Sequence, residues 1–566
     1  MANTRLSTPL NSSPSRASVS VPAYFWTLIV GAIALLLASP VLVILSTVFA
    51  NTGAVWQHLT ETVLVTYIAN SFWLMLGVGI GVTVIGTGTA WLVTMCRFPG
   101  RWLFEWALLL PLAAPAYILA YVYTELLAFY GPVQTELRNI FGWKSVTDYW
   151  FPNVRSLWGA ILMLTLVLYP YVYLLARSAF LSQSVAVLEA SRSLGCGPWR
   201  SFLTIALPLA RPAVMAGLAL ALMETLNDFA TVQFFSVDTF TTGIYRTWFG
   251  MDERLAASQL AVCLLLFVFW LVLLERWSRG RAKYYQTVSS HQQLRGYRLN
   301  WLGKILAILA CLLPVNLGFL IPGGILLKMA LEDPSRSFDS RFWEFGTNSL
   351  TLALLTAALA VVIAILMAYG LRLFPNPGTQ LATQIAAMGY AIPGSVIAVG
   401  ILVPVGSLDN AIDAWMKTTF NVSTGLLLSG TIAALVFAYL VRFLAVSLST
   451  VEASLTKIKP SLDDAARSLG HGPLSTLWRV HVPLIAGGLF TAATLVFVDV
   501  MKELPATLIV RPFNFDTLAV RVYNLASDER LGEASGAALA IVLVGLVPVI
   551  LLSLGIARSR CTVSHG

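Results

Sequence analysis

The seven residues EASRSLG at positions 189–195 recur almost unchanged as DAARSLG at positions 464–470. In each copy a proline, Pro208 or Pro483, follows the glycine by thirteen residues. The copies are 275 residues apart (464 minus 189), which is close to half of the 566-residue chain. A repeat of this size indicates two related halves and directs attention to whatever the halves share.

Further matches extend the repeat. At the same offset Asp228-Phe229-Ala230-Thr231 aligns with Glu503-Leu504-Pro505-Ala506, and Arg246 aligns with Arg521. Nearer the start of each half, Asn70-Ser71 and Asn348-Ser349 correspond at an offset of 278. Because each repeated loop falls on the same side of the predicted spans, the halves are expected to form a parallel pseudo-dimer.

The composition places the chain in a membrane. It is 57% hydrophobic and only 11% charged, with a mean hydropathy of +0.78, whereas soluble domains carry about 25% charged residues. A membrane helix needs about 20 apolar residues, and twelve stretches qualify, which leaves no room for a large soluble catalytic domain. They centre on residues 24–50, 69–95, 106–130, 155–182, 212–232, 257–274, 303–331, 347–372, 379–406, 426–450, 486–508 and 535–557.

The loops predict the topology and the domain organisation. Basic residues follow the second and sixth spans, and acidic residues fill the opposite loops, as expected when both termini are cytoplasmic. This bias explains the net charge of +9 without a nucleic-acid partner. The predicted parts are a disordered cytoplasmic tail (1–20), a first membrane half (21–274), a basic cytoplasmic linker (275–302) and a second membrane half (303–566).

Each repeated loop is predicted to form a short amphipathic helix that ends at its glycine, since glycine readily takes the left-handed conformation that closes a helix. A second short helix is expected to stop at the following proline. Small side chains would leave one side of the first helix bare, so that another protein could cover it. The predicted contact residues are Glu189, Ala190, Ser191, Gly195 and Pro208, and Asp464, Ala465, Ala466, Gly470 and Pro483.

These loops resemble the "EAA" loops of permease subunits in binding-protein-dependent ABC importers, with Asp464 in place of the glutamate in the second copy. The resemblance implies an all-α type I importer fold in a bacterial inner membrane. It also implies two copies of a cytoplasmic ABC ATPase seated on the loops, and a periplasmic binding protein that delivers the substrate. Fused permeases of this kind resemble the ferric-iron and thiamine branches, and segments 227–232, 239–246 and 502–508 are similar to the ferric branch.

Motifs for catalysis are missing from the sequence. It contains no Gly-x-x-x-x-Gly-Lys-Ser/Thr phosphate loop, so ATP is expected on a partner subunit and the chain itself is expected not to be an enzyme. No His-Glu-x-x-His motif occurs, and the five cysteines include no Cys-x-x-Cys pair. No tightly bound cofactor is therefore expected.

Intramembrane carboxylates mark the predicted substrate pathway. If the fifth span begins near Pro212, Glu224 lies about 18 Å and Asp228 about 24 Å along a hydrocarbon core of roughly 30 Å. The two acids are four residues apart, so they are expected to share one face of the helix. The second half repeats the pair, with the same spacing, as Asp499 and Glu503. Because a charge in the membrane is costly, these acids should face water or a partner.

We expect the four acids to line the pathway and to contact a transported metal ion transiently. A purely structural role, in which they support neighbouring helices, remains open. Lys502 lies three residues from Asp499 and could neutralise it, while Arg246 and Arg521 could attract an anion or, as the favoured alternative, pair with the acids.

The sequence thus favours a permease that imports ferric iron by alternating access. A permease for thiamine or another small solute is the alternative within the class. A secondary transporter driven by protons, in which the acids would be proton relays, is a rival that the paired loops disfavour.

Overall fold

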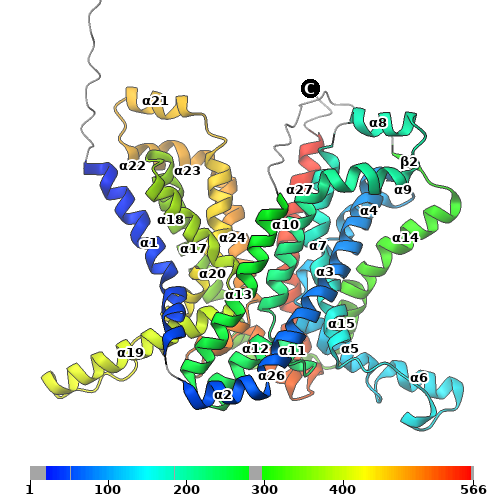
Figure 1. Cartoon of the computed structure of the whole chain (residues 1–566), viewed down its shortest axis with the longest axis horizontal. Coiled ribbons are helices and arrows are strands. Elements are labelled where there is room, and N and C mark those ends of the chain that lie inside the picture. The colour runs from blue at the N-terminus through cyan, green and yellow to red at the C-terminus, as the bar shows by residue number, and fades with distance from the viewer. Residues whose placement is uncertain (1–20, 51, 184, 280–295, 562–566) are drawn as a thin grey trace, which may run out of the picture.

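The computed structural model describes residues 21–50, 52–183, 185–279 and 296–561. The predicted tail (1–20) and most of the predicted linker (280–295) lie outside the described residues. Nearly all described elements are helices (Figure 1). Those before the linker are α1 (Val21–Ser46), η1 (Thr47–Phe49), α2 (Gly53–Thr62), α3 (Leu64–Met95), β1 (Cys96–Arg97), α4 (Arg101–Ala107), η2 (Leu110–Ala113), α5 (Ala116–Leu127), α6 (Pro132–Phe141), η3 (Val146–Asp148), α7 (Leu157–Leu181), α8 (Val185–Ser193), α9 (Pro198–Ser201), η4 (Phe202–Ala206), α10 (Leu207–Asn227), α11 (Ala230–Phe234), α12 (Phe240–Tyr245), η5 (Arg246–Gly250) and α13 (Arg254–Arg279).

The elements after the linker repeat this order. They are β2 (Tyr297–Arg298), α14 (Trp301–Val315), η6 (Asn316–Leu320), α15 (Ile321–Glu332), α16 (Pro334–Ser337), α17 (Ser340–Leu373), α18 (Pro377–Ala387), η7 (Met388–Ala391), α19 (Gly394–Phe420), α20 (Ile432–Leu455), α21 (Pro460–Ser468), α22 (Pro473–Thr476), η8 (Leu477–His481), α23 (Val482–Leu484), α24 (Ala486–Met501), α25 (Pro505–Val510), α26 (Leu518–Ser527) and α27 (Leu531–Cys561).

Ten helical segments among the described residues are long and apolar enough to cross a membrane, and two bent pairs raise the number to twelve. The first pair, Arg101–Ala113 with Ala116–Phe141, bends by 90°, and the second, Pro473–Leu484 with Ala486–Met501, bends by 78°. The first bend falls at Pro115, whose backbone is extended and whose ring excludes a continuous helix. The predicted all-helical fold of about twelve spans is confirmed.

The first helix of each half packs on the other half. Helix α1 lies beside α17, α18 and α19 (Figure 1), where the Asn376 side chain donates a hydrogen bond of 3.0 Å to Thr27. Conversely, α14 lies beside α3 and α4, and the Tyr123 hydroxyl of α5 donates to the Leu317 carbonyl over 2.6 Å. The predicted halves, 21–274 and 303–566, are therefore not separate bodies in space. A uniformly apolar helix carries no signal for which half it will contact, so the sequence could not reveal this exchange.

The two halves run in parallel, as the repeat predicts. Asn70 donates to the Asp238 carbonyl over 2.9 Å in the first half, and Asn348 donates to the Asp516 carbonyl over 3.1 Å in the second. Helices α8 and α21, which contain the repeated loops, lie at the same end of the bundle, whereas α2, α6, α12 and α26 lie at the other end (Figure 1). We call these the coupling end and the opposite end.

The positions of equivalent helix starts in the two halves correct the alignment of Arg246 with Arg521. Thr239 and Thr517 are the N-caps of α12 and α26, which fixes an offset of 278 in this region. Arg246 therefore corresponds to Asn524 rather than to Arg521, and the two arginines are not equivalent. A loop three residues longer in the second half produces the change of offset.

Candidate functional site

A polar cavity lies where the two halves meet. Its volume is about 120 Å³, which is room for a small solute with several waters. All four predicted acids line it, together with Lys502. Its other polar side chains are Tyr117, Tyr171, Asn227, Tyr390 and Arg442.

Two of the four acids are held by the backbone. Helix α10 begins at Leu207, five residues before the predicted start, and ends at Asn227, so Asp228 lies beyond its last turn with an extended backbone. The Asp228 carboxylate accepts hydrogen bonds from the Thr231 hydroxyl (2.8 Å) and the Val232 amide (3.2 Å) at the start of α11. The expectation that Glu224 and Asp228 share a face of one helix is therefore wrong.

In the second half, the Glu503 carboxylate likewise accepts hydrogen bonds at the start of a short helix. It accepts from the amides of Ala506 (2.9 Å) and Thr507 (3.1 Å) and from the Thr507 hydroxyl (2.6 Å) at the start of α25. The Glu503 side chain is 1% exposed. A carboxylate satisfies unpaired amides at a helix start, so Asp228 and Glu503 have a structural role at the rim of the cavity.

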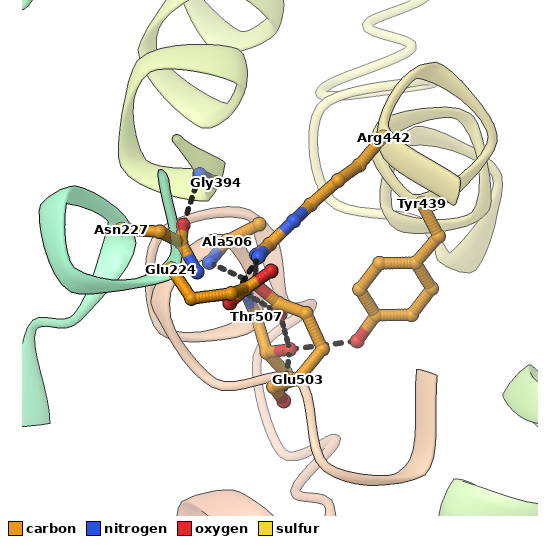
Figure 2. A network of polar contacts seen from close by, with 8 residues as sticks. All are labelled: Glu224, Asn227, Gly394, Tyr439, Arg442, Glu503, Ala506 and Thr507. Carbon is orange, nitrogen blue, oxygen red and sulfur yellow. Dashed lines mark hydrogen bonds and ion pairs between the residues drawn. The ribbon is translucent and has the colours of Figure 1, made fainter. Parts of the chain in front are cut away.

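Arg442 is the central cation of the site. It extends from α20 to the point where the halves meet, with its guanidinium 3.2 Å from the Glu503 carboxylate and 3.4 Å from that of Glu224 (Figure 2). The Arg442 side chain is 6% exposed and that of Glu224 is 21% exposed. One buried arginine therefore joins an acid of each half.

A second contact lies beside this arginine. The Asn227 side chain accepts a hydrogen bond of 2.7 Å from the Gly394 amide at the start of α19 (Figure 2). A Cβ at Gly394 would lie 2.8 Å from the Glu503 carboxylate and 3.1 Å from Arg442. Glycine is thus needed for the start of α19 to fit against Arg442 and Glu503 of its own half.

Asp499 and Lys502 form an ion pair of 3.0 Å, in accordance with their spacing of three residues. Their side chains are 19% and 28% exposed. Asp499 and Glu224 are thus the two acids without backbone capping contacts, and each has one cation of the second half as its partner. No group of three or more His, Cys, Asp or Glu in the described part of the chain is placed to hold a metal ion. The four acids therefore do not converge as one set of metal ligands, and their transient contact with a transported ion stays a prediction.

The two remaining predicted pathway residues lie elsewhere. Arg246 pairs with Asp238 at 2.6 Å, and Arg521 pairs with Asp339 at 2.7 Å. Neither arginine lines the cavity. The prediction that they pair with the four acids is wrong, because each has a carboxylate of its own half within reach near the opposite end.

Both repeated loops form the predicted glycine-terminated helices. Gly195 and Gly470 have φ angles of +78° and +83°. The Cys196 amide donates to the Ser191 carbonyl over 3.1 Å, and the His471 amide donates to the Ala466 carbonyl over 3.0 Å. This bond across the glycine is the Schellman closure of a helix.

We call α8 and α21, the helices of the repeated motif at the coupling end, the coupling helices. The exposed face of each is narrower than expected. Glu189 and Ala190 are exposed, as are Asp464 and Ala465. The third residue of each motif instead faces its own chain: Ser191 and Ala466 are buried, and the Ser191 hydroxyl lies 2.5 Å from that of Ser201. A partner could therefore contact the first two residues of each motif but not the third.

The prolines do not end the second short helix as predicted. In the first half the chain is helical without interruption from Pro198 to Asn227, and Pro208 lies in the first turn of α10. A π-helical turn, η4, precedes the proline and accommodates the missing amide donor. In the second half the break comes at Ile485, two residues after Pro483.

Sequence reasoning missed Arg442, although a signal was present. It is the one charged residue between positions 432 and 451 of an apolar span, and a charge inside a membrane span marks a functional position. Its counterpart at the offset of 275 is Val167, so the search for repeated residues passed over it.

Comparisons with known proteins define the class. The family model described as "Binding-protein-dependent transport system inner membrane component" matches twice, at residues 83–284 and 360–559. The chain belongs to this family, and it is a multi-pass inner-membrane permease with two fused halves rather than an enzyme.

Three relatives are informative. The "Fe(3+)-transport system permease protein FbpB 2" of Haemophilus influenzae is 27% identical over 541 residues, covering 94% of this chain and 98% of the relative. The "Ferric transport system permease protein FbpB" of Actinobacillus pleuropneumoniae is 23% identical, covering 86% and 70%. The "Molybdenum transport system permease protein ModB" of Escherichia coli is 34% identical, covering 26% of this chain and 61% of the relative.

Proposed function

We propose that this chain is the membrane subunit of an ATP-driven importer that carries ferric iron from a periplasmic binding protein to the cytoplasm. The observation that carries the proposal is the excess of acid in the cavity between the halves, where four carboxylates face two cations. Carboxylate and phenol oxygens suit a hard cation such as ferric iron, and Tyr117, Tyr171 and Tyr390 line the same space. The names of the two relatives that match over most of this chain agree with this cargo.

The distribution of the four acids over ion pairs and helix caps fits a pathway rather than a tight binding site. A cation that found several unpaired carboxylates together would bind too tightly to leave, and transport requires release. Arg442 and Lys502 each hold one of the two acids that have no capping role. Ferric iron would briefly replace Arg442 or Lys502 as the partner of these carboxylates and would not stay bound.

ATP hydrolysis would act through the coupling end. Two copies of a cytoplasmic ATPase would contact the exposed residues of α8 and α21, one copy for each helix. The coupling end is then cytoplasmic, both termini are cytoplasmic, and the binding protein docks at the opposite end.

The contacts between the halves would serve as the gate toward the binding protein. Glu224 lies seventeen residues after the start of α10, or roughly 25 Å along the helix, and is therefore far from the coupling end. The Arg442–Glu224 pair and the Asn227–Gly394 hydrogen bond join the halves at this level. Movement of the two coupling helices toward each other would break these contacts and open the cavity to the periplasm.

Other cargoes and mechanisms have less support. The relatives described above are named for the transport of iron or molybdenum and not of thiamine. The molybdenum relative covers only a quarter of this chain. A proton-driven secondary transporter is disfavoured because the family comprises components of binding-protein-dependent systems.

Uptake by the reconstituted complex tests the proposal. The chain would be placed in liposomes with its ATPase inside and its binding protein outside, and radioactive ferric iron, thiamine and molybdate would be offered separately. We expect ATP-dependent accumulation of iron alone. Accumulation of another solute in preference to iron would overturn the cargo, and uptake driven by a proton gradient without ATP would overturn the mechanism.

A further inference from the structure

The second coupling helix is attached to its half by a partly buried ionic cluster. Asp463 lies in the first turn of α21, one residue before the repeated motif. Its carboxylate accepts two hydrogen bonds from Arg372 at the end of α17, from Nη2 over 2.7 Å and from Nε over 3.1 Å. Nε2 of His481 in η8 lies 2.7 Å from the other carboxylate oxygen, and His481 is fully buried.

Arg372 also holds the end of α20. Its Nη1 donates to the Leu455 carbonyl over 2.6 Å, and its Nη2 donates to the Ile458 carbonyl over 3.0 Å. These carbonyls lie at and just beyond the last residue of α20, where helix carbonyls have no partner of their own. One guanidinium therefore connects α17, the end of α20 and the start of α21, in the fork geometry that only arginine provides.

A tyrosine extends the cluster to the next short helix. Tyr369, one turn before Arg372 on α17, donates its hydroxyl to the Pro473 carbonyl at the start of α22 over 2.7 Å. Its ring packs edge-on against His481 with centroids 5.4 Å apart. Both ends of the loop that contains the repeated motif are thus fixed to α17.

The first half lacks all three members of the cluster. The residues that correspond to Asp463 and His481 are Leu188 and Ala206 at the offset of 275, and Thr94 corresponds to Arg372 at the offset of 278. Among the described side chains of the first half, the polar contact between the coupling helix and the following helix is the pair Ser191–Ser201. The attachment of the two coupling helices is therefore asymmetric.

We infer that Asp463 is a positioning residue that makes α21 move as one body with α17 and α20. Helix α20 carries Arg442, the cation that joins the halves. A displacement of α21 would then reach the gate through Arg372 and α20 without being absorbed by the loop. Because the first half has no such cluster, the second half would transmit more of the motion of its coupling helix. The inference rests on the ATPase-coupling role proposed above for α21.

The ratio of solute transported to ATP hydrolysed tests this role, with the full complex in liposomes. Asp463→Leu installs the residue of the first half, and we expect the ratio to fall about fivefold or more, the lower range of coupling between protein sites. Binding of the ATPase, measured by co-purification, should stay normal, since Asp464 and Ala465 remain exposed. Glu332→Gln, which removes an exposed carboxylate far from the cluster, should leave the ratio unchanged.

Two further variants keep the test decisive. Arg372→Thr combined with Asp463→Leu should lower the ratio no more than either change alone, because residues that act as one unit are not additive. If Asp463→Leu does not accumulate, Asp463→Asn has the same shape without the charge and should lower the ratio to a smaller extent. The inference would be overturned if Asp463→Leu had the same ratio of solute transported to ATP hydrolysed as the wild type. If only Asp463→Asn accumulates, an unchanged ratio in that variant would overturn it. Loss of ATPase binding would also overturn the inference, because Asp463 would then act at the docking surface itself, and it would leave the proposed coupling role of α21 intact.

Discussion

Arg442 and Glu224 form an ion pair of 3.4 Å although they are 218 positions apart and belong to different halves. The same guanidinium lies 3.2 Å from Glu503 of its own half. Since the first half has Val167 at the corresponding position, the pseudo-symmetric site contains one such arginine rather than two. The ion pair between the halves at the cavity therefore depends on a single arginine.

Replacing this side chain should weaken the closed arrangement of the halves. Arg442→Leu leaves Glu503, with a 1% exposed side chain, without its cation, although its hydrogen bonds from Ala506 and Thr507 remain. Breaking a buried ion pair costs about 3–5 kcal/mol, and these hydrogen bonds place the expected loss at the lower end. We expect a clearly lower thermal unfolding midpoint in detergent. Arg442→Leu combined with Glu503→Gln should recover part of the loss.

A matched control is available for this experiment. Arg155 and Glu529 also lie 3.3 Å apart across the two halves, but their side chains are 44% and 76% exposed. Arg155→Leu should change stability by roughly 0–1 kcal/mol, as for other surface pairs. Equal effects of the two arginine substitutions would show that burial of Arg442 has no special weight.

The glycines of the coupling helices should be sensitive to substitution through backbone conformation alone. At Gly195 and Gly470 an added Cβ meets nothing within 4 Å, yet both have positive φ. Valine is strongly disfavoured there, so Gly195→Val and Gly470→Val should uncouple ATP hydrolysis from uptake while the chain remains in the membrane. Gly197→Ser, at a negative φ where serine is a favoured N-cap, should have little effect. Normal coupling in both valine variants would contradict the assignment of these loops.

The cavity acids should separate into two groups when their charge is removed. Asp499→Asn should lower ferric uptake, because Asp499 is partly exposed in the cavity and its charge is the partner of Lys502. Asp228→Asn should have a smaller effect, since asparagine keeps an acceptor for Thr231 and caps helices well. Initial rates of radioactive iron uptake measure the difference.

Lys502→Ala provides the complementary arm of this experiment. It leaves Asp499 without its cation, and iron should then be held longer and released more slowly from the complex. Basal ATP hydrolysis should not change in any of these variants. Unchanged uptake in Asp499→Asn would assign the acids to a structural role.

Labelling of single cysteines should establish sidedness. In a background without the five native cysteines, Ser289→Cys in the linker should react only from the cytoplasm. Glu332→Cys, at an exposed position at the end of α15, should react only from the periplasm. Asp409, which the sequence alone would suggest as a second periplasmic probe, is fully buried and bonded to Ser429, so it is unsuitable. The reverse pattern of labelling would contradict the topology.

Much of the candidate site was visible in the sequence because its signals are local. The Lys502–Asp499 pair follows from a spacing of three residues on a helix. The capping role of Glu503, in contrast, depends on where α24 ends and α25 begins. A shift of a few residues in those boundaries changes a pathway residue into a helix cap, and hydrophobicity does not locate boundaries that finely.

The sequence by itself determined the two fused halves, the twelve apolar spans and the glycine-terminated coupling helices. Each of these depends on hydropathy, periodicity or the φ preference of one residue, which are properties of a short stretch of chain. Only the tertiary structure decided that α1 packs on the second half, that α14 packs on the first half, and that Arg442 joins the halves. It also decided that Asp463 anchors one coupling helix, whereas the other has Leu188 at the corresponding position. These features depend on which surfaces meet across hundreds of residues, and apolar helices of similar composition can be packed in several ways until side chains of complementary shape and charge select one.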